Sequence, residues 1–495
     1  MNFKKIFIKN RILFLLLAIV IVAIVLRFAN YQNRFGLAGD QARDVLIIRE
    51  ALKLHKLPIV GPFSASGPYV FGPIWFWIFS LPVALFPKTF LAPWIFQSLL
   101  FVLMIPIMFF IGKKMIDETF GIIISLLTAL SPSIVKISTN LIFSALVCFL
   151  SLVVIYYFIS HLKNKKIRSF YLLIFFISIA INIHFEAIPL IVLIPFAYFA
   201  RKKTLSNLIV SAILFVIPFA PLIYFNNIYN NYEINNIMQS VVFKKTATHS
   251  FLPIQILKNE LNFSISLFPN IWNSTISGYS IPGLIMFLIT LAILTYALSK
   301  NTINKQIEIL SITFLIMLGI VGDYNGTLFK NLTAFTFPFV VIICGWVCYF
   351  IYKQKQYLGI GILAMILISS LINNFYNIKN STNIAATSAV YWEHQLYKKY
   401  PNQNFAVFSY STNYLDKSLP LSLYLDVAGR IDANGRKIGI ANFGDPVNYL
   451  VSINGPDRMR IYDFAKTPDR ELTNQNFSEN NPSYVYENTV DWYKK

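Results

Sequence analysis

The sequence is poor in charge and in low-complexity segments. Charged residues make up only 13% of the 495 residues, whereas soluble globular chains carry about 25%. Hydrophobic residues make up 56%, which excludes a soluble enzyme, a disordered chain and a fibrous protein. The 20 glycines and 23 prolines are ordinary numbers and exclude low complexity. What remains is a helical membrane protein with several spans and one polar part large enough to fold.

Cysteine is also scarce, and its placement excludes a disulfide framework. The three cysteines, Cys148, Cys344 and Cys348, all lie in apolar runs. Cys344 and Cys348 are one helical turn apart, but small apolar packing residues explain them better than a metal site does. Because no cysteine lies in a polar segment, we expect no disulfide in a domain outside the cytoplasm.

Acidic residues are few, at 22 against 42 lysines and arginines, and the formal net charge is +20. Short basic clusters separate the apolar stretches, as is typical of cytoplasmic membrane loops. We therefore expect membrane lipid as a partner and no nucleic acid. The clusters lie at residues 4–11, 113–114, 163–168, 201–203, 300–305 and 353–355.

The apolar stretches predict about eleven transmembrane helices, since each crossing needs about 20 apolar residues. They lie near 12–29, 90–112, 119–135, 141–160, 170–183, 187–200, 205–224, 281–299, 307–321, 333–352 and 357–373. Residues 69–87 are apolar too, but Pro73 and Pro82 interrupt them, and a full span there would move every later basic cluster outside. We therefore expect a juxtamembrane or re-entrant segment at 69–87.

This pattern predicts an all-α polytopic membrane domain over residues 1–375, with a cytoplasmic N-terminus in a plasma (inner) membrane. A first outer loop at 30–89 and a large outer loop at 225–280 then lie outside. Residues 376–495 are polar and predict a small α/β extracytoplasmic domain. Its expected helix lies at 382–400 and its expected strands at 405–410, 436–441, 449–453 and 459–464. This domain carries no catalytic motif, and we interpret it as a cap or an acceptor-recruiting module.

The sharpest polar group lies in the first outer loop. Asp40, Arg43 and Asp44 occupy positions i, i+3 and i+4 of an expected helix, so they share one face. Two carboxylates and a guanidinium at a membrane surface suit a general base held beside a phosphate. The alternative is a helix cap with a local ion pair on a solvated face.

Three further sets of polar residues lie on the same predicted side of the membrane. Ionisable residues at a membrane edge are costly and tend to be functional. Each set also has an ordinary structural explanation, as a satisfied histidine, a solvated loop or a polar turn. The sets are His184 with Glu186, then Lys244, Lys245 and His249, and last Asp323, Tyr324 and Lys330.

In the order of these features the chain resembles the glycosyltransferase-C superfamily, and within it the protein O-mannosyltransferase and aminoarabinose transferase group. The first outer loop opens with an Asp followed three residues later by an Arg, and an aromatic-proline segment comes next. A Ser-Pro closes the third span, and a polar-aromatic turn precedes a late span. The residues concerned are Asp40, Arg43, residues 71–77, Ser131, Pro132, residues 322–324, Phe337 and Pro338.

The resemblance implies roles for the first-loop residues. Asp40 would be the general base that takes the proton of an acceptor hydroxyl, and Arg43 would orient it or contact the donor phosphate. Many relatives carry Asp-Glu where this chain has Asp40-Gln41. The aminoarabinose transferases carry Glu-Lys, linked to metal and phosphate binding, where this chain has Phe71-Gly72.

The expected function is therefore inverting transfer of a sugar from a polyprenyl phosphate to a hydroxyl of a glycan, lipid or protein. Positive or polar groups would bind the departing phosphate, and a divalent ion (Mg, Mn or Zn) remains an open cofactor. A lipid-linked sugar transporter or flippase is the main alternative, and a catalytically inactive relative that binds lipid or glycan is the third. The expected phosphate ligands are Lys244, Lys245, Lys330 and Tyr324; the possible metal or substrate ligands are His184, Glu186, His249 and Asp323.

Overall fold

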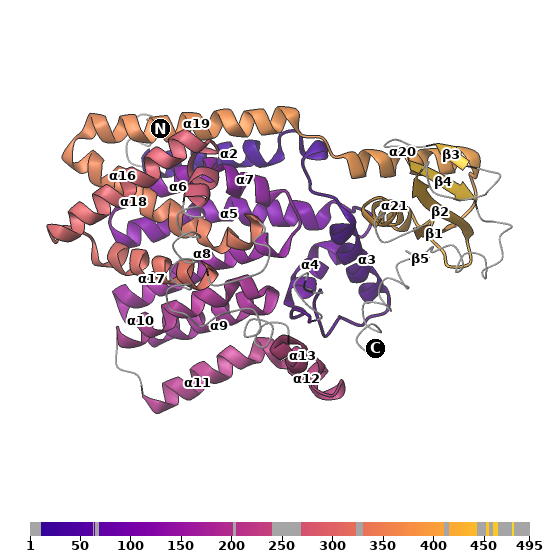
Figure 1. The fold of residues 1–495 in the computed structure, drawn as a ribbon, viewed down its shortest axis with the longest axis horizontal. Helices are drawn as coiled ribbons and strands as arrows, with labels where there is room; N and C mark the ends of the chain where they lie inside the picture. Colours follow the sequence, from indigo (N-terminus) through magenta and orange to yellow (C-terminus); the bar gives the residue numbers. More distant parts are fainter. Residues whose placement is uncertain are drawn as a thin grey trace, which may run out of the picture.

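The structure is a computed structural model, and it describes most of the chain. The described residues are 11–62, 64, 69–200, 204–239, 269–322, 330–409, 415–442, 452–454, 459–463 and 478–479. Side chains at 322, 330–332, 415–417 and beyond 440 lie outside that description. Within it, a bundle of long helices adjoins a smaller unit with one sheet (Figure 1).

Seven helical segments of the described chain are long and apolar enough to cross a membrane, so the protein is an integral membrane protein. Three of them combine shorter helices. The segments are Arg11–Phe28 (α2), Ala92–Met115 (α5), Phe143–Asn164 (α8), Leu205–Ile228 (α11 Leu205–Val216, η3 Ile217–Phe219 and α12 Ala220–Ile228), Ser280–Ser299 (α16), Thr333–Gln354 (the end of η6, then α18) and Gln356–Lys399 (α19 and α20).

An eighth span arises if Glu118–Leu130 (α6) and Pro132–Ser138 (α7) cross together. The two helices are bent by 57° at Ser131. The bend has a local cause, because the Ser131 backbone leaves the helical region and Pro132 begins the next helix. The Ser131 hydroxyl also donates to the Thr275 carbonyl at 2.6 Å.

The remaining predicted stretches also form helices, of which Lys305–Gly322 (α17) has 18 residues and the others are shorter. Each predicted stretch coincides with helix, but length and composition support seven or eight crossings, so the predicted number of about eleven stays a prediction. The other elements are Tyr31–Asn33 (η1), Ile167–Ile183 (α9), Phe185–Val192 (η2), Leu193–Phe199 (α10), Tyr232–Ile237 (α13), Asn273–Ser277 (η5, a π-helix), Lys305–Gly322 (α17), Lys330–Thr336 (η6) and Phe337–Gln354 (α18).

Helix α18 lies at the centre of the bundle. Of its best membrane-spanning window, 94% of the residues are buried by the other helices. Cys148, Cys344 and Cys348 are buried and unpaired in this core, which agrees with their interpretation as packing residues. Gly345 allows close contact with α6, because a Cβ atom there would come within 2.4 Å of Ile124.

Two short helices of the first outer loop cover one end of the bundle. They are Gly39–Lys53 (α3) and Ile74–Leu85 (α4), and in Figure 1 they lie between the bundle and the sheet. Helix α4 has 12 residues with Pro82 inside it, so it is shorter than the roughly 20 residues of a crossing. This agrees with the juxtamembrane prediction for residues 69–87.

The smaller unit consists of two helices and a mixed sheet. Strand β1 pairs in parallel with β2, and the other pairs are antiparallel, in the order β3-β4-β2-β1-β5. The elements are Ile384–Lys399 (α20), Phe405–Ser409 (β1), Leu415–Val427 (α21), Arg436–Asn442 (β2), Ser452–Asn454 (β3), Met459–Asp463 (β4) and Ser478–Glu479 (β5). The predicted helix and four strands are present, which agrees with an α/β tail.

Helix α21 was not predicted, and its sequence explains why. Pro420 lies inside the helix, and Leu419, Leu421, Leu423 and Leu425 alternate with a period of two, which is typical of a strand. All four leucines are buried. One side of α21 packs on β1 and α20, and the other packs on α3 of the first outer loop (Figure 1).

Candidate functional site

The first two turns of α3 carry two carboxylates joined by one arginine. Helix α3 begins after Ala38, whose N–H donates to the Gln41 side-chain carbonyl at 3.0 Å. Gln41 therefore serves as a capping residue of this helix, at the position where the resemblance places Glu. Arg43 then reaches both neighbours: its Nη1 lies 2.7 Å from Asp40 Oδ1, and its Nη2 lies 2.8 Å from Asp44 Oδ1. The predicted shared face is confirmed.

The two carboxylates differ sharply in environment. The Asp40 side chain is 76% exposed, whereas that of Asp44 is 2% exposed. Arg43 donates from Nε as well as Nη2 to Asp44, at 2.9 and 2.8 Å, so the buried carboxylate fixes the guanidinium plane. The guanidinium then holds the exposed carboxylate. Asp40 is therefore the solvent-accessible carboxylate of the two, and Asp44 anchors the guanidinium that holds it.

Burial also separates the protonation of these groups. Burial raises the pKa of Asp44 to about 6, although the Arg43 charge and hydrogen bond lower it. For Arg43, burial lowers the pKa, but the charges of Asp44 and Asp40 outweigh burial and raise it overall. At neutral pH the Arg43–Asp44 pair is therefore ionised.

His184 and Glu186 meet at the turn between α9 and η2. The Glu186 N–H donates to His184 Nδ1 at 3.2 Å, so this ring nitrogen carries no proton. The 3.7 Å approach of Glu186 Oε2 to the same nitrogen is therefore not an ion pair. Ser144, in the first turn of α8, donates to Glu186 Oε2 at 3.0 Å.

The described residues do not form a metal site. In that part of the chain, no three His, Cys, Asp or Glu side chains come together at metal-binding range. His184 Nδ1 is already occupied by a backbone proton, which leaves Glu186 and the other ring nitrogen as two ligands, fewer than zinc takes from protein. Lys244, Lys245, His249, Asp323 and Tyr324 lie outside the described residues, as does the Lys330 side chain.

This chain has Phe71-Gly72 where the resemblance places Glu-Lys, and the glycine has a steric reason. The Gly72 N–H donates to the Asn182 carbonyl at 2.7 Å. A Cβ atom at position 72 would come within 2.0 Å of the Asn182 side-chain amide. That amide is buried and donates to the Pro218 carbonyl at 2.8 Å. A lysine at position 72 would therefore collide with Asn182, and this chain cannot present the usual basic residue there.

Sequence reasoning missed a buried carboxylate on α13. Glu233 is 3% exposed, and its two carboxylate oxygens accept from the Val70 N–H at 3.2 and 3.1 Å. Burial raises the pKa of Glu233 to about 7, against the opposing effect of the Val70 hydrogen bond. The residue joins α13 to the segment before α4. Its local sequence, between Tyr232 and Ile234, gave no signal except one acidic residue among apolar and amide side chains.

The α3 site and the Glu186 site share a connecting segment. Gly36, just before α3, donates its N–H to the Thr139 carbonyl at 2.9 Å. Gln97 of α5 donates to the Asn140 carbonyl at 2.6 Å and so holds the segment that Gly36 contacts. Four residues after Asn140, Ser144 contacts Glu186. Residues 139–144 therefore connect the two carboxylate sites, which lie at the same end of the bundle.

A family model described as dolichyl-phosphate-mannose-protein mannosyltransferase matches residues 68–225. No curated protein matches the chain significantly. Among solved structures, ArnT from Cupriavidus metallidurans in the apo state is similar, with a TM-score of 0.58 at 10% identity over 90% of this chain and 97% of that chain. The same protein bound to undecaprenyl phosphate gives a TM-score of 0.54 at 11% identity, over 91% and 98%.

The archaeal oligosaccharyltransferase AglB from Archaeoglobus fulgidus is similar as well. Its complex with an inhibitory peptide and a dolichol-phosphate gives a TM-score of 0.52 at 12% identity, over 88% of this chain and 70% of that chain. At these identities the likeness shows a shared fold. The similarity extends over 88 to 91% of this chain.

Proposed function

We propose that the chain, whose fold is similar to those of ArnT and AglB, is a glycosyltransferase-C enzyme that transfers a sugar from a polyprenyl phosphate to an acceptor hydroxyl. The observation that carries the proposal is the pair of unequal carboxylates on α3. Asp40 is exposed, and it is held by an arginine that a buried carboxylate fixes. The undecaprenyl phosphate and dolichol-phosphate named with ArnT and AglB support a lipid-linked donor.

The chemistry follows from that geometry. Asp40 takes the proton of the acceptor hydroxyl while the oxygen attacks the anomeric carbon. The bond from that carbon to the phosphate oxygen breaks, polyprenyl phosphate leaves, and the configuration inverts. We assign phosphate binding to Lys244, Lys245, Lys330 and Tyr324 as a working hypothesis, because the developing negative charge needs nearby donors. The acceptor is a glycan, a lipid or a protein.

Charge at the two ends of the bundle supports an orientation with α3 outside the cytoplasm. Lys113 and Lys114 end α5, Lys163 ends α8 and Lys353 ends α18. The ends of α5 and α8 meet, since Lys114 Nζ donates to Ser160 at 2.6 Å, and Lys353 Nζ lies 3.8 Å from Asp117 Oδ2, two residues after α5. Basic residues favour the cytoplasmic face. We therefore propose that the α3 site and residues 376–495 lie on the other face of a plasma (inner) membrane.

Sugar release from a panel of polyprenyl-phosphate sugars tests the proposal. We expect the purified protein in lipid nanodiscs to release polyprenyl phosphate and to glycosylate an added acceptor from at least one donor. Each reaction is run with Mg²⁺, Mn²⁺ or Zn²⁺ and with a chelator, which decides metal dependence separately. Movement of an intact donor across proteoliposomes without cleavage would contradict the transferase and favour a transporter.

Transfer should depend on pH through Asp44. Below its pKa of about 6 the buried carboxylate takes a proton, and Arg43 loses the charge that fixes it against Asp40. We expect kcat/KM to fall about tenfold per unit of pH below about pH 6 and to level off above it. A pH–rate profile of the wild type beside Asp44→Asn measures this. An acid limb that persists unchanged in the variant would assign it to another group.

A further inference from the structure

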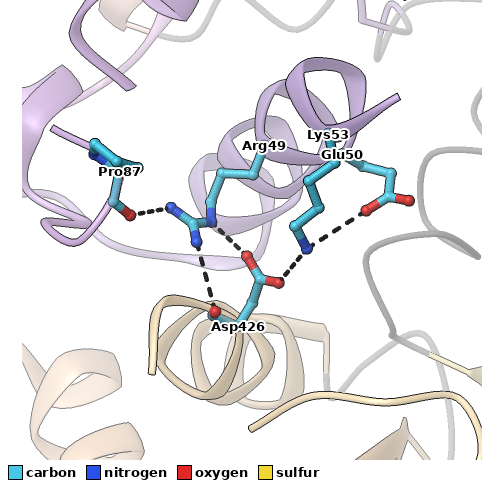
Figure 2. Close-up of polar contacts among 5 residues, drawn as sticks. All are labelled: Arg49, Glu50, Lys53, Pro87 and Asp426. Carbon is cyan, nitrogen blue, oxygen red and sulfur yellow. Dashed lines mark hydrogen bonds and ion pairs between the residues drawn. The ribbon is translucent and has the colours of Figure 1, made fainter. Parts of the chain in front are cut away.

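The C-terminal unit contacts α3 through a charge cluster, in which a buried carboxylate pairs with two cations. Asp426, near the end of α21, has a side chain that is only 2% exposed. Its carboxylate accepts from Arg49 Nε and from Lys53 Nζ, the latter at 2.7 Å. Arg49 and Lys53 are one turn apart on α3, and both point at α21 in Figure 2. One carboxylate thus joins two cations from a helix that lies more than 370 positions earlier in the chain.

This cluster differs from an ordinary surface ion pair. Arg49 is 11% exposed, and its Nη1 also donates to the Pro87 carbonyl at 2.7 Å (Figure 2). The ring centroids of Tyr424 and Phe90 lie 4.5 Å apart, which adds an apolar contact between the same two units, whereas the Lys53 side chain is 50% exposed. The buried Arg49–Asp426 pair is weakly screened by salt. Loss of Asp426 leaves Arg49 buried without its charge partner.

A second contact holds the other end of α3. Asn383, just before α20, donates from Nδ2 to the Phe35 carbonyl at 2.6 Å, and its side chain also caps α20 by accepting from the Ala386 N–H. Phe35 lies four residues before α3 begins. The C-terminal unit therefore contacts the chain four residues before α3 through Asn383. It contacts the last turns of α3 through Asp426.

Between these two contacts stand the residues of the candidate site. Helix α3 has 15 residues, so it is a rod about 22 Å long at 1.5 Å per residue. Asp40, Arg43 and Asp44 occupy its first turns, whereas Arg49 and Lys53 occupy its last turns. A displacement at one end of a rigid helix is carried to the other. The position of Asp40 relative to the bundle therefore depends on the contact of Asn383 with Phe35 and on the contacts of Asp426 with Arg49 and Lys53.

We propose that Asp426 and Asn383 are positioning residues, through which the C-terminal unit holds α3 and sets the place of Asp40 without touching substrate. The inference rests on the proposed function for its catalytic consequence, but the positioning itself is a structural claim. The unit is then a required part of the transferase and not only a module that recruits an acceptor.

The test uses the full-length protein in nanodiscs, with Asp426→Asn beside two controls. Asp426→Glu keeps the charge, and Asp432→Asn removes a carboxylate from an exposed turn of the same unit, where it accepts only from the Asn434 N–H in the described contacts. Spin labels at Lys88→Cys and Lys398→Cys report the distance between the first outer loop and α20. Amide hydrogen exchange over residues 39–53 reports the order of α3.

For Asp426→Asn we expect a broadened label distance, faster exchange over α3, and kcat lowered tenfold to a hundredfold with the donor KM unchanged. Asp426→Glu and Asp432→Asn should keep the narrow distance and most of the turnover. A narrow distance and unchanged α3 exchange in Asp426→Asn would overturn the positioning role, and so would full kcat despite a released unit. If the wild type turns over no donor, the proposed function fails, while distance and exchange still decide whether the C-terminal unit positions α3.

Discussion

Replacement of Asp40 by asparagine is expected to lower kcat for sugar transfer by a factor of about 10² to 10⁴, the usual contribution of a positioned general base. Asparagine has the shape of aspartate, and its carbonyl can still accept from Arg43 Nη1, which lies 2.7 Å from Asp40 Oδ1. What it cannot do is take a proton. Because the Asp40 side chain is 76% exposed, the substitution should leave the fold intact.

Three measurements separate loss of the base from loss of the protein. Donor binding and thermal stability of Asp40→Asn should match the wild type, while single-turnover transfer collapses. Glu118→Gln is the matched control, since Glu118 is half-exposed and pairs with Lys113 at 2.7 Å at the opposite end of the bundle. That variant should keep full activity. Undiminished transfer by Asp40→Asn would remove Asp40 as the base and direct attention to Glu186.

The spacing of Asp40, Arg43 and Asp44 was sufficient to predict that they share a face, because helical geometry alone decides it. It could not predict which carboxylate is exposed. Exposure depends on tertiary packing, and α3 packs against α4 and against α21, which lies far along the chain. A local pattern therefore identified the group of residues, whereas tertiary structure exposes one carboxylate and buries the other.

The tail illustrates the same limit at a larger scale. Its helix and four strands follow from capping residues and from β-branched and aromatic runs, which are local signals. Helix α21 is enclosed on two sides, so its leucines need no amphipathic spacing and the periodic signal is lost. The pairing of Asp426 with Arg49 is equally invisible, since each residue is unremarkable in its own segment.

At Gly72 the resemblance in sequence does not predict the residue that is present. Relatives of the aminoarabinose transferase group carry a basic residue at this place, but here the Asn182 amide occupies the space that a side chain would need. The basic residue that the resemblance places at position 72 is therefore absent, and its absence has a steric cause that a motif comparison does not show.

Replacement of Arg43 by alanine should be the most destabilising single change at the site. It removes the cation that pairs with both Asp40 and Asp44. The Asp44 carboxylate, 2% exposed, is then buried without a positive partner. Breaking a buried pair in this way costs about 3 kcal/mol or more. Transfer should be lost as well, because no group then holds Asp40. Thermal unfolding in nanodiscs, followed by Trp fluorescence, measures the first effect, and single-turnover assays measure the second.

The double variant Arg43→Ala/Asp44→Asn separates these two effects. Asparagine removes the uncompensated charge, so most of the lost stability should return while transfer stays absent. The single variant should also become less stable as pH rises, because burial already raises the pKa of Asp44 to about 6 and loss of Arg43 raises it further. A raised folded-state pKa means that protonation stabilises the fold at low pH, and that contribution is lost as pH rises through the folded-state pKa. The double variant has no such carboxylate and should not show this dependence. Equal stability of Arg43→Ala and the wild type at all pH values would mean that Asp44 does not need its cation, and the anchoring role of Asp44 would then be wrong.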